Sequence, residues 1–301
     1  LLMHLFADFG AAGFPGVFYV FFVKVVVNMA RSELVLTLPM PIYVDDMGLI
    51  GKMQSEVDAM MRSFQLWAMA VVGIAFKWLK DKVAARRQLM VGFWWDSVAR
   101  TRTLEERKLV SYLEMLQDFM TRRVLSLVER QQIAGRMIRG VMTLPPGASC
   151  FLSNMFNLAR GLRLPWHKRR TTKCERGDYR TLFELLSANM GRGYFSFDQF
   201  SWAPVCLSDA CKRARFAGGG WVSACGRFSF FTYGAADRRK PIDFLEGDSW
   251  LAAVEALCHT WHRKLVPFGL DNMSMKGSHS RGWSRADRLN LILRRLFQLQ
   301  L

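Results

Sequence analysis

The sequence predicts a mixed fold of the α+β or α/β class, and three successive patterns support this. A short β-type run carries two adjacent aspartates near residue 45, apolar residues recur at helical spacing from 101 to about 140, and strand and helix patterns alternate from residue 203. With 301 residues, 51% of them hydrophobic, the chain can bury more than one core. We therefore expect three parts, residues 1–100, 101–202 and 203–301.

The charge of the chain points to a polyanionic partner. Its 42 lysines and arginines outnumber 25 aspartates and glutamates, which gives a net charge of +17 at pH 7. This excess favours nucleic acid over an anionic membrane, although charge alone does not separate the two. Basic residues are densest from Arg160 to Arg180. This segment is either a solvated linker or a phosphate-contacting surface, in which we expect Arg169 and Arg170 to bind nucleic acid.

The most apolar stretch, from Phe14 to Val27, is expected to be a buried helix. It contains Pro15, Gly16 and Lys24, and its apolar runs are shorter than a bilayer requires. We expect no stable membrane association, and a membrane-associated protein anchored here stays the less favoured alternative. The six cysteines form no CxxC pair, which favours reduced thiols in an intracellular protein, cytoplasmic or nuclear.

The sharpest local pattern is a predicted hairpin with two carboxylates at its tip. Two β-type runs flank the aspartates in the sequence Ile42-Tyr43-Val44-Asp45-Asp46-Met47-Gly48. Carboxylate oxygens are the ligands that hard cations such as Mg²⁺ prefer. Two-metal phosphoryl transfer places such ions about 3.5–4 Å apart. Aspartate is also a common turn residue, so the pair alone is not specific.

The context of this pair resembles the Tyr-x-Asp-Asp box in the palm of reverse transcriptases. The earlier segment Phe9 to Phe18 is similar to the family's Phe-Gly-x-x-x-x-Pro-x-x-Phe motif. The resemblance implies a partial palm in which Asp45 is a catalytic metal ligand, Asp46 is its catalytic neighbour and Tyr43 lies near the primer end. The family's other palm aspartate has no counterpart, so we expect no polymerase activity from this chain alone.

A helical connection is expected after the palm. Apolar residues recur at three- and four-residue steps in Leu104, Leu109, Leu113, Leu116, Met120, Val124 and Leu127. This spacing predicts one helix face that runs through residues 101 to 140. The region resembles the start of the thumb or connection helices of the same family.

From Ala203 the chain predicts a mixed sheet with helices. A β-run ends at Asp209, a glycine turn at 218–220 and a strand follow, a helix begins at Asp248, and a last strand ends at Asp271. Two aspartates at the ends of neighbouring strands would meet at one edge of the sheet, as two-metal hydrolysis of a phosphodiester needs. Each aspartate alone is more often a cap or turn residue.

This series resembles an RNase H-like domain. The resemblance makes Asp209 and Asp271 catalytic metal ligands, and it places the family's helix glutamate at Ser249. Serine offers no anionic ligand, so the metal set is expected to be incomplete. The run Ser284 to Asn290 is similar to a stretch in retroelements of the DIRS type, and it indicates Asp287 as a further carboxylate near the site.

Together these patterns are similar to the reverse transcriptase/RNase H region of a retrotransposon polyprotein, DIRS-type or gypsy-like, truncated at its N-terminus. The resemblance implies Mg²⁺ or Mn²⁺ as cofactor and an RNA–DNA hybrid or other nucleic acid as partner, with contacts from Lys276 and Arg281. We expect a fragment that is inactive alone. The alternative is a non-catalytic remnant that binds nucleic acid. Cleavage gained by Ser249→Glu would indicate a sound scaffold that had lost one ligand.

Overall fold

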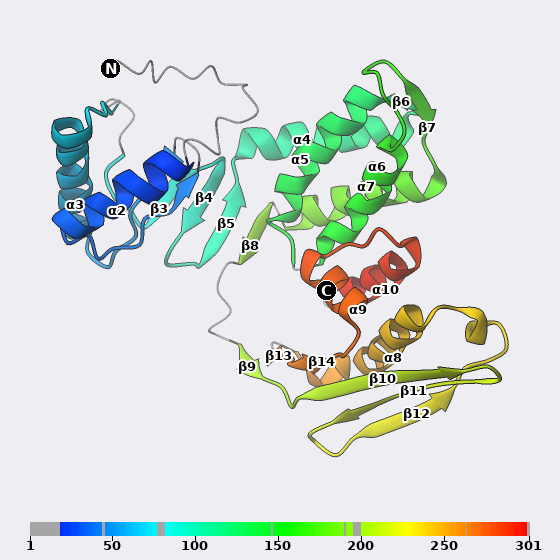
Figure 1. Ribbon diagram of the computed structural model, residues 1–301. Helices are drawn as coiled ribbons and strands as arrows, with labels where there is room; N and C mark the ends of the chain where they lie inside the picture. Colours follow the sequence, from blue (N-terminus) through cyan, green and yellow to red (C-terminus); the bar gives the residue numbers. More distant parts are fainter. Residues whose placement is uncertain are drawn as a thin grey trace. The chain divides into compact units, whose positions relative to one another are not determined.

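The structure is a computed structural model, and it describes residues 19–43, 46–76, 82–145, 147–189, 191–194, 200–262 and 264–299 (Figure 1). Two compact units divide the chain, Leu1–Val98 and Ala99–Leu301. Both units contain helices and strands, which confirms the mixed class predicted from the sequence. The expected boundary between residues 202 and 203 stays a prediction.

The first unit holds a small apolar core between its helices. Its elements are η1 (Tyr19–Val26, a π-helix), α2 (Val27–Glu33), β1 (Ile42–Tyr43), β2 (Asp46–Met47), α3 (Gln54–Trp67), η2 (Ala68–Val72), β3 (Arg87–Met90) and β4 (Phe93–Asp96). Phe22, Val26 and Ala30 are buried in one cluster with Phe64 of α3. The described part of the apolar stretch is therefore helical, but the expected burial holds for one face only, because Val20 and Val25 are 55% and 44% exposed. None of the helices among the described residues has the length and apolar character needed to cross a bilayer.

The expected hairpin around the Asp-Asp pair is present. Strands β1 and β2 are antiparallel, and their register pairs Ile42 with Met47 and Tyr43 with Asp46. Asp45 lies outside the described residues, as does the segment Phe9 to Phe18. The hairpin is thus confirmed, whereas the roles of its carboxylates stay predictions.

The second unit begins with a helical part. Its elements are β5 (Thr101–Leu104), α4 (Glu106–Thr121), β6 (Val124–Ser126), α5 (Leu127–Val141), η4 (Ala148–Leu152), α6 (Ser153–Ala159), β7 (Lys168–Arg170), α7 (Lys173–Ala188) and β8 (Arg192–Tyr194). The expected single helix face through residues 101 to 140 is wrong, because β6 pairs with β7 and separates α4 from α5. Ser126 then starts α5 through a capping box with Glu129, which fixes a new helix start.

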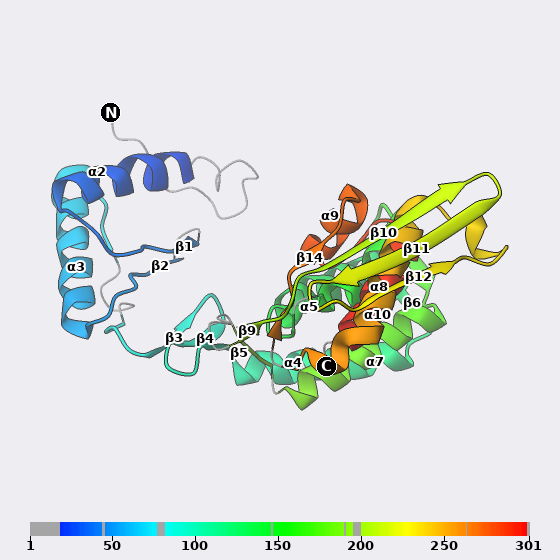
Figure 2. The same ribbon diagram turned by 90° about the horizontal axis from the view of Figure 1, so that it is seen from below.

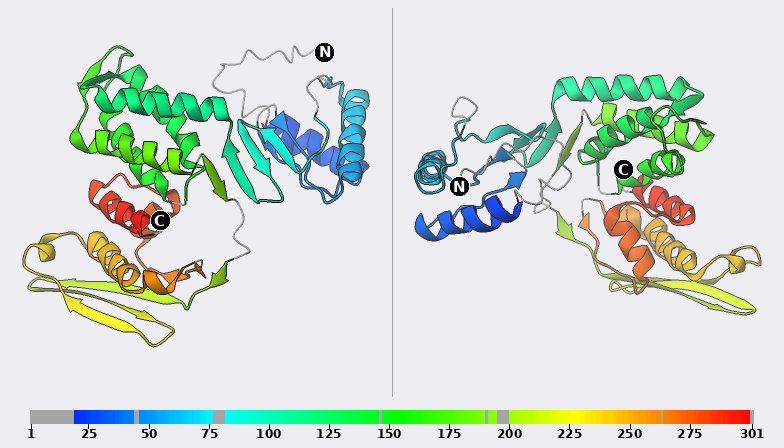
Figure 3. Two further views of the ribbon diagram at one scale, coloured as in Figure 1. Left: turned by 180° about the vertical axis from the view of Figure 1, so that it is seen from behind. Right: turned by 45° about the horizontal axis from the view of Figure 1, so that its top comes forward.

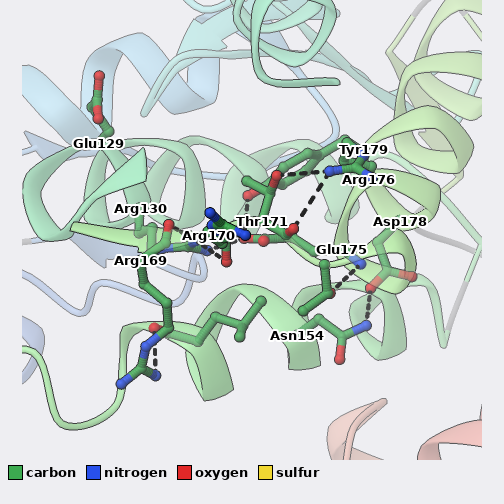
Figure 4. A network of polar contacts seen from close by, with 12 residues as sticks. Glu129, Arg130, Asn154, Arg169, Arg170, Thr171, Glu175, Arg176, Asp178 and Tyr179 are labelled. Carbon is green, nitrogen blue, oxygen red and sulfur yellow. Dashed lines mark hydrogen bonds and ion pairs between the residues drawn. The ribbon is translucent and has the colours of Figure 1, made fainter. Parts of the chain in front are cut away.

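A buried polar network holds this helical part together (Figure 4). Arg130 of α5 and Glu175 of α7 form a salt bridge in which both side chains are fully buried. The Tyr179 hydroxyl donates to Glu175 Oε1 at 2.6 Å, and Arg130 Nη2 donates to the carbonyl oxygen of Arg169 at 3.1 Å. The pair therefore joins two helices to the backbone of β7.

The rest of the second unit is a mixed sheet covered by helices. Its elements are β9 (Ser201–Trp202), β10 (Cys206–Arg213), β11 (Phe216–Ser223), β12 (Phe228–Thr232), η5 (Asp237–Arg239), α8 (Ile242–Leu257), η6 (Cys258–Thr260), β13 (Lys264–Leu265), β14 (Phe268–Gly269), α9 (Met273–Arg281) and α10 (Asp287–Gln298). Four strands lie in the order β12-β11-β10-β14, and β10 is parallel to β14 but antiparallel to β11. Helix α8 lies along one face of this sheet (Figures 1 and 2). Helix α10 lies between α8 and the helical part (Figure 3).

The glycines at 218–220 lie inside strand β11 and do not form the expected turn. The turn between β10 and β11 falls at residues 214–215 instead. A Cβ atom added at Gly219 would overlap Ser249 Oγ on α8. Glycine is required here because the helix approaches the sheet too closely for a side chain. The same contact places Ser249 in the interface between helix and sheet.

Candidate metal centre

Three carboxylates meet where strand β14 ends beside β10. Asp209 comes from β10, Glu246 from α8 and Asp271 from the loop after β14, and each offers an oxygen within 4.8 Å of the other two. The strand register explains how the two aspartates meet. The last pair of the parallel ladder is Leu207 with Gly269, and two residues after these lie Asp209, still in β10, and Asp271, in the loop after β14.

The expectation that the set lacks a glutamate is wrong, because Glu246 completes it. The sequence prediction began the helix at Asp248, whereas α8 begins at Ile242. Glu246 therefore lies outside the predicted helix. Leu245, Ala253 and Leu257 are buried on α8, and this spacing was the signal for the longer helix.

Ser249 packs in the interface between helix and sheet, and it does not occupy the position of the metal-binding glutamate that the resemblance implied. Its side chain is fully buried, and its Oγ lies 3.1 Å from the Tyr233 hydroxyl. Residues three apart on a helix lie on neighbouring parts of one face. Ser249 therefore faces the sheet while Glu246, one turn earlier, reaches the aspartates.

The carboxyl group of Glu246 is in an unusual environment. Its side chain is 9% exposed, and Oε2 is buried with no hydrogen-bond partner among the described residues. Burial, followed by the charges of Asp271 and Asp209, raises the pKa of Glu246 to about 7. A buried oxygen without a partner, facing two other carboxylates, is costly unless a proton or a cation satisfies it.

The donor set fits a hard divalent cation. All three ligand groups are carboxylates, the chemistry that Mg²⁺ and Mn²⁺ prefer over sites with thiols or imidazoles. Asp209 and Asp271 are exposed, so a cation held by them would be open to a phosphate that approaches from solvent. Glu246 contributes its buried Oε2, which has no hydrogen-bond partner among the described residues, from helix α8.

Three other residues expected at the site, Asp287, Lys276 and Arg281, lie outside the group of three carboxylates. Asp287 starts α10 and accepts a hydrogen bond from Asn157 Nδ2 at 2.9 Å, and it is not grouped with the three carboxylates among the described residues. Lys276 and Arg281 are both exposed on α9, the helix that follows Asp271. Their contact with nucleic acid stays a prediction.

The two arginines of β7 differ in their surroundings. The Arg169 guanidinium donates to the carbonyl oxygens of Leu158 and Arg160 at 3.0 and 3.1 Å. Its donors thus cap the end of α6 and stabilise the fold. Arg170 is exposed and stays available for the predicted contact with phosphate.

We expect Ser249→Glu to destabilise the second unit and to create no activity. The added carboxylate would lie between Gly219 and Tyr233, where overpacking and a buried charge together cost about 3 kcal/mol or more. Thermal unfolding followed by circular dichroism measures this loss. Ser249→Ala is the matched control and should lose about 1 kcal/mol, the value of one hydrogen bond. A Ser249→Glu protein as stable as wild type would contradict this placement of the side chain.

Comparison with known proteins gave weak structural similarity only. No family model and no curated protein matches the chain. Among solved structures, it is similar to a foamy viral protease-reverse transcriptase with an RNA/DNA hybrid, at 14% identity and a TM-score of 0.42, covering 89% of this chain and 35% of that one. It is also similar to the same kind of protein with double-stranded DNA, at 15% identity and a TM-score of 0.43, covering 90% and 52% respectively. The chain therefore spans between a third and about half the length of these structures.

Proposed function

We propose that residues 203–301 form an RNase H-like domain that cleaves the RNA strand of an RNA–DNA hybrid with divalent cations. The observation that carries this proposal is the meeting of Asp209, Glu246 and Asp271, with a buried Glu246 oxygen that lacks a partner. The order of elements from β10, three strands, a helix, two short strands and two helices, agrees with the resemblance. The net charge of +17 supports a nucleic-acid partner.

The chain's own residues have distinct tasks in this reaction. When bound, Mg²⁺ or Mn²⁺ would lower the pKa of a water molecule and offset charge on the scissile phosphate. Asp209 presents its carboxylate from strand β10, and Asp271 presents its own from the loop that follows β14. The raised pKa of Glu246 means that a proton and a cation compete for its carboxylate, which acts as a third ligand in its ionised form.

The larger context is part of the same proposal. The antiparallel hairpin with Tyr43 opposite Asp46 supports a partial reverse-transcriptase palm, and hence the reverse transcriptase/RNase H region of a retroelement. Its carboxylates, Asp45 and Asp46, are proposed as palm catalytic residues. The alternative of a non-catalytic remnant rested on the absent glutamate, and Glu246 removes that ground.

A cleavage assay tests the proposal directly. The purified chain is incubated with a hybrid whose RNA strand is labelled at its 5′ end, in Mg²⁺ or Mn²⁺. We expect cleavage of the RNA in the hybrid, no cleavage of the same RNA alone or of double-stranded DNA, and complete inhibition by EDTA. Binding of the hybrid without cleavage in either metal would favour the non-catalytic remnant.

Stabilisation by Mg²⁺ should increase with pH. The pKa of Glu246 is about 7 in the folded protein, above its ordinary value of 4.5. The folded state therefore binds more protons than the unfolded state between these values, so this group's contribution to stability falls as pH rises through that window. A cation competes with the same proton. We expect a small rise in Tm at pH 6 and a rise of about 2–4 °C at pH 8, when free Mg²⁺ is about tenfold above Kd.

Glu246→Gln provides the control for this pH dependence, because it cannot ionise. Its Tm should respond weakly to Mg²⁺ at both pH values. Equal stabilisation of the wild-type protein at pH 6 and pH 8 would show that the cation binds elsewhere.

A further inference from the structure

A cavity of about 650 Å³ lies in the second unit, away from the carboxylates. Its walls come from the ends of α5 and α9, from η4, and from strands β5 and β8. Helix α9 begins two residues after Asp271 and ends at Arg281, which lines the cavity. The nine residues of this helix span about 13 Å. One helix thus connects the candidate metal centre with the cavity.

The cavity is cationic. Among the described residues that line it are two arginines, Arg102 and Arg281, and no carboxylate. Arg102 Nε is buried and has no hydrogen-bond partner among the described residues. A buried donor without a partner is costly, and a guanidinium pairs well with a phosphate. The charge of the cavity therefore favours an anionic ligand.

Aromatic side chains line the same cavity as the two arginines. Trp283 is half-buried, and its ring centroid lies 6.0 Å from that of Phe156. Tyr194 of β8 also lines the cavity and is 53% exposed. Rings of this kind stack on nucleic-acid bases, whereas guanidinium groups pair with the backbone. The volume falls within the range of about 300–1,000 Å³ usual for ligand sites.

Two glycines stand next to residues that line the cavity, Gly193 before Tyr194 and Gly282 between Arg281 and Trp283. Gly282 ends α9 with a φ of +73°, a left-handed conformation that suits glycine, and the chain turns there before Trp283. At Gly193, a Cβ would lie 2.7 Å from the carbonyl oxygen of Thr143. Glycine at this position lets β8 approach the end of α5.

We propose that this cavity binds one nucleotide of a single-stranded nucleic-acid segment. Its phosphate pairs with Arg102 and Arg281, and its base stacks on Trp283. A free mononucleotide has the same chemistry. This inference deepens the proposed function and rests on it for the choice of a strand. The net charge of +17 also favours a polyanion.

Fluorescence anisotropy with the full chain and a fluorescein-labelled 12-nucleotide RNA tests this assignment. EDTA is present throughout, so that no hydrolysis occurs. We expect Arg281→Gln to weaken binding at least fivefold and to lower the salt dependence by about one ion. Trp283→Leu should weaken it about tenfold, and Trp283→Phe, which keeps a ring, by much less. The matched control Arg285→Gln removes an exposed arginine outside the cavity and should change affinity less than twofold.

Two results would overturn this proposal. Arg281→Gln and Trp283→Leu proteins with wild-type Tm and the affinity of Arg285→Gln would overturn the proposal. Binding of a fluorescently labelled AMP without any binding of the RNA would overturn the assignment of a strand. Because the assay contains no metal, a failure of hybrid cleavage leaves this inference standing, and loss of this binding leaves the metal centre untouched.

Discussion

Replacing Glu246 by glutamine is expected to reduce metal-dependent cleavage of the RNA strand at least about 10²-fold. The amide keeps the size of the side chain but removes the negative charge from a set of three carboxylates. It also relieves the repulsion from Asp209 and Asp271 that raises the pKa of Glu246. The variant should therefore be at least as stable as wild type without metal, while the cleavage rate falls.

Glu255→Gln is the matched control for this variant. Glu255 lies on the same helix, is exposed, and pairs with Arg295 at 2.9 Å. The substitution makes the same change in charge and should leave cleavage within about twofold of wild type, as expected for an exposed ion pair. Equal rates for Glu246→Gln and Glu255→Gln would show that Glu246 takes no part in the reaction.

The largest effect on stability is expected at the buried pair in the helical part. Arg130→Met should lower the free energy of unfolding of the second unit by about 3–5 kcal/mol, because Glu175 is left as a buried charge without its partner. The Arg130 contact with the Arg169 carbonyl is lost as well. Urea unfolding followed by circular dichroism measures the change.

Two further proteins separate the charge effect from a packing effect. Replacing the pair together, as Arg130→Met with Glu175→Leu, should recover much of the lost stability, because no buried charge remains. Arg295→Met breaks an ion pair that is 52% and 43% exposed, and it should cost less than about 1 kcal/mol. An Arg130→Met protein as stable as Arg295→Met would contradict the role given to the buried pair.

The features that local patterns determine were predicted well from the sequence. The hairpin around Tyr43 and Asp46 follows from two short β-type runs and a turn. Asp209 and Asp271 were expected to meet at the ends of neighbouring strands, and they do lie close together. Asp209, however, lies inside β10, which continues to Arg213, and Asp271 lies in the loop after β14. Their catalytic role stays a prediction.

The features that depend on packing between distant segments were missed. The sequence pattern did not identify Glu246 as a site residue, because it begins the helix at Asp248, six residues after the start of α8 at Ile242. The glycines at 218–220 suggested a turn, but the close approach of Ser249 explains glycine in a strand. Likewise, only the pairing of β6 with β7 divides the helical pattern between α4 and α5. None of these contacts is visible from local spacing.

Anomalous diffraction from a crystal soaked in Mn²⁺ tests the central claim most directly. The account predicts Mn²⁺ bound by oxygens of Asp209, Glu246 and Asp271, at distances of about 2.1 Å, and loss of that peak in Glu246→Gln. Mn²⁺ bound elsewhere, with these three carboxylates free of metal at saturating concentration and pH 8, would contradict it.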